Sequence, residues 1–376
     1  MKSQLKHAGF GLLLLSALNS QLSTVLAQGS LTPPGAPAPT MKSLDQIEAR
    51  TPIDAAHTPG DANNQFIISA PGSYYLTGNI TGVSNLNCIE INVDNVTLDL
   101  NGFALIGVSN SLWGIWVAAP HKNLRVHNGS VQNWGGSGMY CWLASNSQFD
   151  HLRASLNYGT GIYGGTRSIF TACTAETNLT GISTDGESTL TGCTAANNSN
   201  YGFTAGNYST VTACTATANG SGGFNLQNNS TVIACTACGN KGGGILPGDA
   251  CTVKDCTVNY NVGSGISGLG SLVIVNCTVN HNSGDGIACN SDSLINGNTA
   301  SYNLNGIYVN NGGSLNRIDG NTANHNSQVG IRWVNDFVIR NNAFLNGSAN
   351  YSPAVGTGNT GPLNAAGNST SPWANF

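Results

Sequence analysis

The sequence predicts an all-β solenoid in which successive coils of about 21 residues each add three short strands to a parallel stack. Two observations carry this prediction. A glycine followed by a bulky apolar residue recurs at intervals of 20 to 24 residues, and 49 Gly and 50 Asn accompany only 8% charged residues. Ordinary soluble domains carry about 25% charged residues, and both Gly and Asn destabilise helix interiors. Long helices, coiled coils and charged disordered chains are therefore excluded.

The charge balance sets aside two classes of partner. The 376 residues include 13 Lys and Arg against 17 Asp and Glu, and the net charge is −4. This thin distribution offers no basic patch for nucleic acid or for an anionic membrane surface. We therefore expect no nucleic-acid partner, and no membrane span once the leader is removed.

The N-terminal residues are typical of a leader followed by a linker. Residues 1–27 combine Lys residues with an apolar stretch over 8–18 and end in small or branched residues up to Ala27, as a secretory signal peptide does. The apolar stretch is shorter than the ~18 residues of a membrane span. We expect a secreted or cell-surface protein, with an extended Pro-rich linker over 28–42.

The ends of a parallel stack present unpaired strand edges, so a solenoid requires caps. We assign residues 43–113 to an N-terminal cap and entry coils, 114–347 to the repeats, and 348–376 to a C-terminal cap or tail.

Three columns of residues keep step through the repeats. The first is the glycine and apolar pair, as in Gly202-Phe203. The second is a slot that Cys fills at 173, 193, 214, 235, 256 and 277, with Asn298, Asn321 and Asn342 taking it afterwards. The third is an Asn five residues beyond the slot, as at Asn219.

Each column has a physical role in the predicted coil. Gly and Asn enter the left-handed backbone region most easily, so we expect them at the corners between strands. Equivalent residues then stack at ~4.8 Å in register, and the Ile and Phe column forms one continuous core. The stacked Asn side chains are expected to bond along their own ladder.

These columns resemble those of the right-handed parallel β-helix repeat proteins, the pectate-lyase-like superfamily. The resemblance covers roughly residues 96–347 and includes the segment 95–103, NVTLDLNGF, which looks like the entry coil of many such proteins. It implies a right-handed, single-stranded parallel β-helix. A left-handed β-helix is disfavoured because its six-residue subrepeat is not seen. The resemblance names no particular activity, since one fold hosts many.

Eleven cysteines in an exported chain first suggest disulfides. The six in the repeat column point in parallel from neighbouring coils, so we predict that they pack as small apolar residues. Two alternatives stay open, a zinc site formed by Cys235, Cys238, Cys251 and Cys256 and a Cys238–Cys251 bridge. No metal centre is predicted.

Charged and aromatic residues gather between residues 113 and 167. Trp116, Tyr140 and Tyr163 each follow an inward apolar residue, so alternation places them outward in one column. One interpretation is a platform on which sugar rings stack, with Arg167 and nearby arginines pairing with uronate carboxylates. The other is an aromatic ladder that stiffens the first coils.

The same region supplies the candidate catalytic residues Asp150, His151, Arg125 and Arg153. The resemblance implies that a polysaccharide lyase would use a basic proton acceptor and calcium held by acidic residues. Few acidic residues lie nearby, whereas Ca²⁺ takes 6–8 oxygen ligands. We therefore predict no cofactor, with Ca²⁺ entering only if the protein is a lyase.

A second stripe of rings, Tyr260, His281, Tyr302 and His325, occupies one offset of the distal repeats. Its two His are separated by two coils, ~10 Å, which is too far for one zinc ion. We predict packing at a turn.

Three functional hypotheses follow. The first is an exported β-helix that binds an extracellular or cell-surface polysaccharide without clear catalytic residues. The second is a polysaccharide lyase or glycoside hydrolase with its site on coils 114–180, and the third is a structural or adhesive surface rod. Whether the protein is an enzyme is left open.

Overall fold

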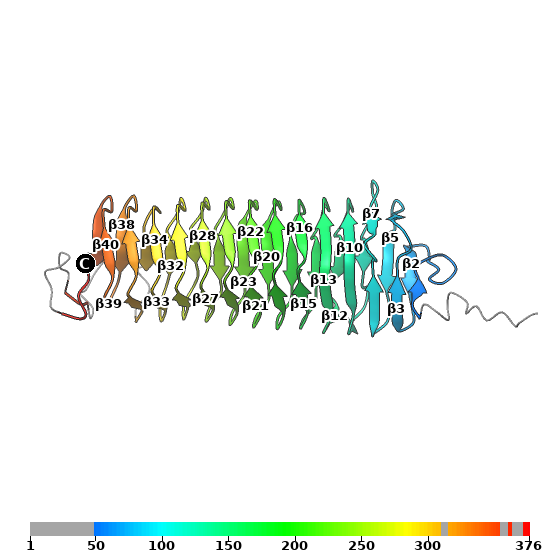
Figure 1. The fold of residues 1–376 in the computed structure, drawn as a ribbon, viewed down its shortest axis with the longest axis horizontal. Coiled ribbons are helices and arrows are strands. Elements are labelled where there is room, and N and C mark those ends of the chain that lie inside the picture. The colour runs from blue at the N-terminus through cyan, green and yellow to red at the C-terminus, as the bar shows by residue number, and fades with distance from the viewer. Residues whose placement is uncertain (1–48, 310–314, 354–359, 363–370) are drawn as a thin grey trace, which may run out of the picture. The chain divides into compact units, whose positions relative to one another are not determined.

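The computed structural model shows a solenoid built from β-strands alone (Figure 1). It describes residues 49–309, 315–353, 360–362 and 371–376. Every strand pair in these residues is parallel and in register, as the prediction of stacked coils requires. Among the described residues, no helix is long and apolar enough to cross a membrane.

The chain divides into two units, Met1–Glu48 and Ala49–Phe376. The predicted signal peptide, 1–27, and linker, 28–42, belong to the first unit and lie outside the described residues. The same holds for the start of the predicted N-terminal cap. All that follows concerns the second unit.

Each coil contributes one strand to each of three faces. The first face is a 14-stranded sheet. Its strands are β2 (Asn64–Ile68), β5 (Asn87–Ile91), β8 (Ile115–Trp116), β11 (Met139–Cys141), β14 (Ile162–Gly164), β17 (Ile182–Thr184), β20 (Tyr201–Ala205), β23 (Gly222–Leu226), β26 (Ile245–Pro247), β29 (Ile266–Ser267), β32 (Ile287–Cys289), β35 (Ile307–Val309), β38 (Val329–Trp333) and β41 (Ala349–Pro353).

The second and third faces belong to one 25-stranded sheet, because β10 (Arg125–Gln132) and β13 (Gln148–Ser155) run through the corner between them. The second face also holds β1 (Thr51–Pro52), β3 (Gly72–Tyr75), β6 (Val96–Asp99), β15 (Ile169–Thr171), β18 (Thr189–Thr191), β21 (Thr210–Thr212), β24 (Thr231–Ile233), β27 (Thr252–Lys254), β30 (Val273–Val275), β33 (Leu294–Asn296), β36 (Arg317–Asp319) and β39 (Phe337–Ile339). The third holds β4 (Ile80–Thr81), β7 (Ala104–Ile106), β16 (Thr174–Glu176), β19 (Thr194–Ala196), β22 (Thr215–Thr217), β25 (Thr236–Cys238), β28 (Thr257–Asn259), β31 (Thr278–Asn280), β34 (Thr299–Ser301), β37 (Thr322–Asn324) and β40 (Asn342–Phe344). A short pair, β9 (His121–Lys122) and β12 (Ala144–Ser145), lies at one corner.

The corner after the third face, here called the Asn corner, confirms the predicted ladder. Asn219 donates from its backbone N and its Nδ2 to Oδ1 of Asn240, at 3.0 and 2.9 Å. Its Nδ2 also donates to the carbonyl of Ala195, at 3.1 Å. The ladder consists of Asn157, Asn178, Asn198, Asn219, Asn240, Asn261, Asn282, Asn303, Asn326 and Asn346. These bonds satisfy buried amide groups that would otherwise be costly.

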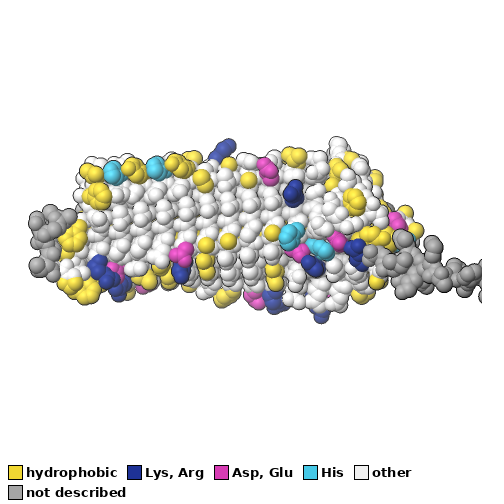
Figure 2. Space-filling model, viewed as in Figure 1, with side chains coloured by type: hydrophobic (Ala, Val, Ile, Leu, Met, Phe, Trp, Pro, Cys, Tyr) yellow, Lys and Arg dark blue, Asp and Glu magenta, His cyan; other side chains and the backbone are white. Residues whose placement is uncertain are grey.

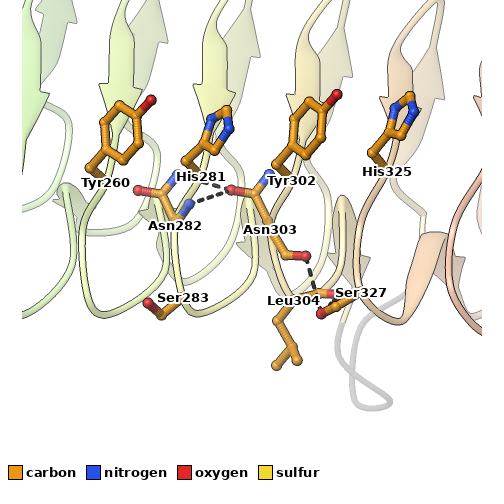
Figure 3. A pocket seen from close by; sticks show the side chains of 9 residues that line it. All are labelled: Tyr260, His281, Asn282, Ser283, Tyr302, Asn303, Leu304, His325 and Ser327. Atoms are coloured by element: carbon orange, nitrogen blue, oxygen red, sulfur yellow. Dashed lines mark hydrogen bonds between the residues drawn. The ribbon is translucent and has the colours of Figure 1, made fainter.

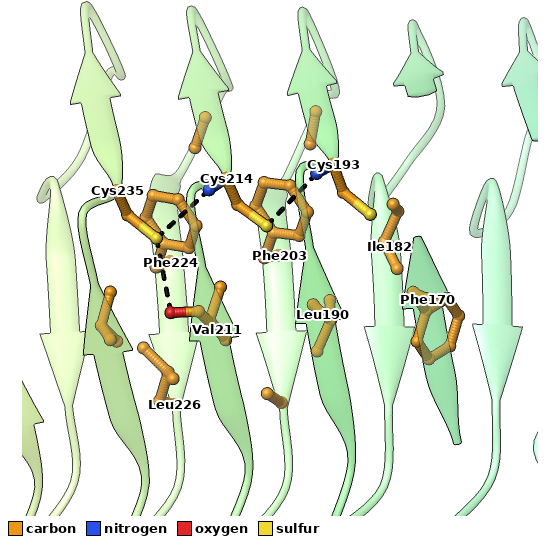
Figure 4. Packing of buried hydrophobic residues seen from close by; sticks show 14 of the residues in the cluster. Phe170, Ile182, Leu190, Cys193, Phe203, Val211, Cys214, Phe224, Leu226 and Cys235 are labelled. Carbon is orange, nitrogen blue, oxygen red and sulfur yellow. Dashed lines mark hydrogen bonds between the residues drawn. The ribbon is translucent and has the colours of Figure 1, made fainter. Parts of the chain in front are cut away.

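The corner between the second and third faces, the Cys corner, uses sulfur in the same way. The backbone N of Cys193 donates to Sγ of Cys214, and that of Cys214 donates to Sγ of Cys235, both at 3.4 Å. These thiols pack beside the Phe203 and Phe224 rings of the core (Figure 4).

Asn residues continue the Cys column in the last coils, as predicted, but the third of them is not the predicted Asn342. Asn298 and Asn321 occupy the slot, but Asn341 follows them rather than Asn342. Asn341 is fully buried, whereas Asn342 is exposed. Asn375, near the C-terminus, then bonds to Asn341 as the next step of the ladder, at 3.1 Å between Nδ2 of Asn341 and Oδ1 of Asn375.

The corner between the first and second faces, the Ser corner, carries a third ladder that the sequence analysis missed. The backbone N of Ser168 donates to Oγ of Ser188 at 3.0 Å, and the N of Ser188 donates to Oγ of Ser209 at 3.3 Å. Each of the three corners thus places a small buried side chain against the next coil.

The repeat glycines are not the left-handed residues, which corrects another expectation. At the corners, the left-handed residue directly precedes the ladder residue and is often neither Gly nor Asn, as at Arg167, Ala213 and Tyr260. The repeat glycines are needed for space instead. A Cβ on Gly223 would lie 2.5 Å from the carbonyl oxygen of Gly244.

Length differences between the regular coils lie in the loop after the Asn corner. Two residues separate Asn178 from Gly181, whereas three separate Asn198 from Gly202. The corner spacings of these two coils are otherwise equal, so the shorter loop leaves all three ladders in register.

All eleven cysteines are free, and the Cys238–Cys251 bridge is not formed. Ten of them are buried, and Cys238 is half-exposed. Burial raises the pKa of Cys141 and of Cys289 to about 12, which disfavours the reactive thiolate.

We therefore expect a thiol reagent to label one cysteine, Cys238, in the native protein and all eleven after unfolding in denaturant. Mass spectrometry of the labelled protein measures both numbers. Cys238→Ser should abolish the native labelling. Fast native labelling of several thiols would contradict the buried ladder.

Candidate functional site

The candidate site lies on the outward side of the first face. The register pairs Trp116 of β8 with Tyr140 of β11, and Tyr140 with Tyr163 of β14. Their neighbours Ile115, Met139 and Ile162 are fully buried in the core. The structure therefore places the three predicted rings outward in one column.

The rings contact one another along this column. Trp113, which the sequence analysis did not select, lies in the same coil as Trp116. Its ring stacks on Trp116, with centroids 4.4 Å apart and 13° between the planes, and on Tyr140, at 5.5 Å and 14°. Trp116 stacks on Tyr140 at 5.4 Å and 13°. Tyr163 meets Tyr140 edge-on, at 5.6 Å and 85°. The stack therefore ends at Tyr163, whose ring is turned across the column.

A polar groove of about 320 Å³ opens beyond Tyr163 on the same face. The hydroxyl of Tyr163 donates to Oδ1 of Asp185 at 3.2 Å, and the hydroxyl of Thr204 donates to that of Ser183 at 2.6 Å. The groove is lined by Tyr163, Ser183, Thr184, Asp185, Gly186, Thr204, Ala205, Gly206, Asn207, Asn225 and Gln227. Its ligand-facing chemistry is hydroxyl and amide groups with a single carboxyl.

Burial changes the ionisation of the groups at the end of the ring column. Desolvation, together with the nearby charge of Asp185, raises the pKa of Tyr163 to about 12. Desolvation also raises the pKa of Asp185, and the hydrogen bond from Tyr163 only partly offsets it. At neutral pH the tyrosine therefore remains a neutral hydrogen-bond donor.

A second carboxyl lies at the opposite end of the column. Glu90 of β5 pairs in register with Trp116 and accepts a 2.6 Å hydrogen bond from Nδ2 of Asn64. Desolvation and then the charge of Asp61 raise the pKa of Glu90. Four coils separate Glu90 from Asp185, a distance on the order of 20 Å. Glycosidase carboxyls lie ~5–9.5 Å apart, so these two cannot act as such a pair.

The predicted catalytic residues do not converge on this face. Arg125 and Asp150 lie on the second face, where Nη2 of Arg125 is 2.7 Å from Oδ2 of Asp150. His151 is exposed at the Cys corner with φ 52°, and Arg153 follows on the third face. The structure thus brings two of the four together and separates the others.

Arg167, the remaining predicted ligand-binding residue, lies at the Ser corner beside the groove. Its backbone N donates to the carbonyl of Gly186, a lining residue, at 3.0 Å. Its guanidinium lies 3.7 Å from the carboxylate of Glu187, and both side chains are exposed. The Arg167 charge is therefore balanced by its neighbour.

The surface around these features carries few charges. Figure 2 shows charged side chains and imidazoles in small groups on a largely uncharged surface. In the described part of the chain, no group of three or more His, Cys, Asp or Glu could hold a metal ion. Nothing in the sequence pattern pointed to Glu90. Glu90 precedes its neighbour Trp116 by 26 residues, more than any repeat interval, so spacing did not identify the pair.

Comparison with known proteins shows the family. The right-handed β-helix region family matches residues 72–212, 114–258, 185–288 and 246–369. No curated protein sequence matches the chain.

Solved structures with a similar course of the chain include two epimerases and a tailspike protein. The A-module of mannuronan C-5 epimerase AlgE6 from Azotobacter vinelandii is 13% identical, covers 76% of this chain and 92% of its own, and has a TM-score of 0.47. The periplasmic alginate epimerase AlgG is 13% identical, with coverages of 80% and 78% and a TM-score of 0.46. The Dettilon tailspike protein is 13% identical, with coverages of 75% and 61% and a TM-score of 0.46.

Proposed function

The chain belongs to the right-handed β-helix family, and we propose that it binds an uncharged polysaccharide along the outward side of its first face. The observation that carries the proposal is the continuity of the ring column with the polar groove. Trp113, Trp116 and Tyr140 lead to Tyr163, which lines the groove itself.

A polysaccharide fits such a surface because each of its sugar units offers apolar C–H groups and several hydroxyls. Aromatic side chains present a large apolar contact area, and a few placed polar groups give orientation. Here the outward edges of the rings, whose faces are stacked on one another, supply the first. Thr204, Asn225 and Gln227 in the groove supply the second. Because both features follow the stack of coils, the bound chain would run along the coil axis.

The charge of the groove supports an uncharged ligand. Asp185 is its one carboxyl, and neither Lys nor Arg is among its lining residues. The guanidinium of Arg167, at the border, is paired with Glu187. A uronate polymer would therefore meet a carboxyl without a compensating cation.

Binding without turnover is the form of the hypothesis that the geometry favours. Glu90 and Asp185 are too far apart for glycoside hydrolysis, and Asp150 is engaged by Arg125 on another face. A lyase or hydrolase on coils 114–180 and a purely structural rod remain the alternatives that the experiment must separate.

We expect the double substitution Trp116→Ala and Tyr140→Ala to weaken retention on the recognised neutral glycan at least about tenfold. Loss of the ring contacts removes about 1.4 kcal/mol or more of binding free energy. Affinity electrophoresis against neutral and acidic polysaccharides measures the effect, with circular dichroism to confirm the fold.

The matched control is Phe337→Ala, which removes a ring that is 40% exposed on the second face, far from the column. It should bind as the unmodified protein does. Unchanged retention of the double variant would contradict the proposal. New reducing ends or unsaturated products in the same mixtures, lost in Asp150→Asn, would instead favour the enzyme alternative.

A further inference from the structure

The distal coils carry a second column of rings, at the Asn corner. Tyr260, His281, Tyr302 and His325 stack with centroids 4.9, 4.7 and 4.9 Å apart and 23°, 10° and 11° between planes. All four side chains are exposed, Tyr260 by 60% and Tyr302 by 51%. They pack at a turn, as the sequence predicts, but they also line an open groove (Figure 3).

The backbone does not require rings at these positions. All four residues are left-handed, with φ between 54° and 57°, a conformation that disfavours residues with a Cβ. At the same position other coils place Asn197 or Gly239, which adopt it more easily. The backbone therefore does not select the rings, since it also takes Leu156, Thr177 and Ala218 at this position.

The groove beside the rings has a volume of about 510 Å³. Leu304, Ser283 and Ser327 also line it (Figure 3). The hydroxyl of Ser327 donates to the carbonyls of Asn303 and Leu304, at 3.4 and 3.3 Å. The amides of Asn282 and Asn303 lie beneath, already bonded within the ladder. Contacts to a ligand would therefore come from the rings and from the hydroxyl of Ser283.

Like His151, and unlike three other described histidines, the two imidazoles have no carboxylate partner among the described residues. His57, His121 and His127 lie 2.8, 3.1 and 3.8 Å from Asp54, Asp94 and Asp99. In the described residues, neither His281 nor His325 forms an ion pair. Their charge, once formed, is available to an external anion.

Aromatic rings flank both of these imidazoles. Tyr260 and Tyr302 flank His281, and Phe344 meets His325 edge-on at 6.0 Å. Lys241 and Asp285 are the charged residues of neighbouring coils at this corner, and neither lines the groove. The carboxylate of Asp285 accepts a 2.7 Å hydrogen bond from Nδ2 of Asn305.

From these features we propose that the groove at the distal Asn corner is a second binding site, which takes an acidic polysaccharide when His281 and His325 are protonated. An imidazolium between two tyrosine rings gains cation–π attraction. Histidine side chains commonly change charge between about pH 5 and 8. The two positive charges would stand two coils apart, which suits carboxylates repeated along a polymer better than a single small anion.

This inference does not rest on the proposed function. The two sites use different residues on different sides of the coil, and they differ in ligand charge. Either one can therefore fail while the other holds.

The test is affinity electrophoresis of the full chain in polygalacturonate at about pH 5.5 and about pH 8, at one ionic strength. We expect at least about tenfold tighter retention at the lower pH. The double variant His281→Asn and His325→Asn should lose that difference, because Asn accepts the left-handed backbone without carrying charge. Its thermal unfolding should match that of the unmodified protein.

Two further variants make the outcome specific. Leu345→Asn changes the same left-handed position one coil beyond His325 and should keep the pH dependence. Trp116→Ala with Tyr140→Ala should keep it as well, although that variant loses neutral-glycan retention. Retention that is independent of pH, or of the two imidazoles, would overturn the proposal. Equally tight, histidine-dependent retention of single-stranded DNA would overturn the assignment to a polysaccharide.

Discussion

Replacement of Asn240 by Ala is expected to lower the free energy of unfolding by about 3–5 kcal/mol. The side chain is fully buried in the middle of the Asn ladder. Its Oδ1 accepts hydrogen bonds from the backbone N and the Nδ2 of Asn219. Its Nδ2 donates to the carbonyl of Ala216 at 3.2 Å and to Oδ1 of Asn261 at 2.9 Å. Ala would leave several of these buried partners without a bond, at about 1–3 kcal/mol each.

Urea denaturation followed by circular dichroism measures this loss. Asn207→Ala is the matched control, because Asn207 is exposed and its side chain belongs to no ladder. Such surface changes usually stay within about 0.5 kcal/mol. A loss below about 1 kcal/mol for Asn240→Ala would show that the amide ladder adds little net stability over hydration of the unfolded chain.

Replacement of Gly223 by Ala is expected to cost about 3 kcal/mol through a steric clash. The new Cβ would lie 2.5 Å from the carbonyl oxygen of Gly244 and 3.1 Å from both Cβ of Ala237 and Nδ2 of Asn240. The first contact is with backbone, which cannot move without parting two coils. The coil could relieve it only by weakening the adjoining ladder.

Gly192→Ala separates this steric effect from backbone preference. Gly192 is left-handed, with φ 62°, and a Cβ there would meet no atom within 4 Å. Its substitution should cost about 1 kcal/mol, because the left-handed backbone is unfavourable for Ala. Equal costs for the two glycines, measured in the same denaturation experiment, would contradict the account of the repeat glycine given above.

Most of the fold could be predicted because each coil repeats the same pattern of residue types. The columns that contain Phe203, Cys214 and Asn219 repeat once per coil, so their spacing gives the coil length and their residue types mark the inward positions. All three columns are buried in the structure. The Ser corner was missed because serine is common throughout this composition. Asn341 was missed because either of two adjacent Asn could fill the slot, and only the five-residue spacing to Asn346 in the Asn ladder separates them.

The candidate site was predictable in position but not in detail. Alternation sufficed to place Trp116, Tyr140 and Tyr163 outward. It says nothing of side-chain torsions, so neither the face-to-face stacking nor the turned ring of Tyr163 could be foreseen. Glu90 lies in an entry coil of irregular length, where spacing no longer shows which residues are neighbours.

The loop after the Asn corner has a consequence for how such a gene can change. Coils of 20 and 21 residues share the same corner spacings. An in-frame duplication or loss of one whole repeat would therefore lengthen or shorten the solenoid by one coil and leave the ladders in register. A single inserted codon within a strand would instead turn the side chains beyond it to the opposite side up to the next corner. The distance between the two proposed glycan sites can therefore change only by whole coils. Relatives that differ by one repeat between the sites would differ in this distance but keep both sites intact.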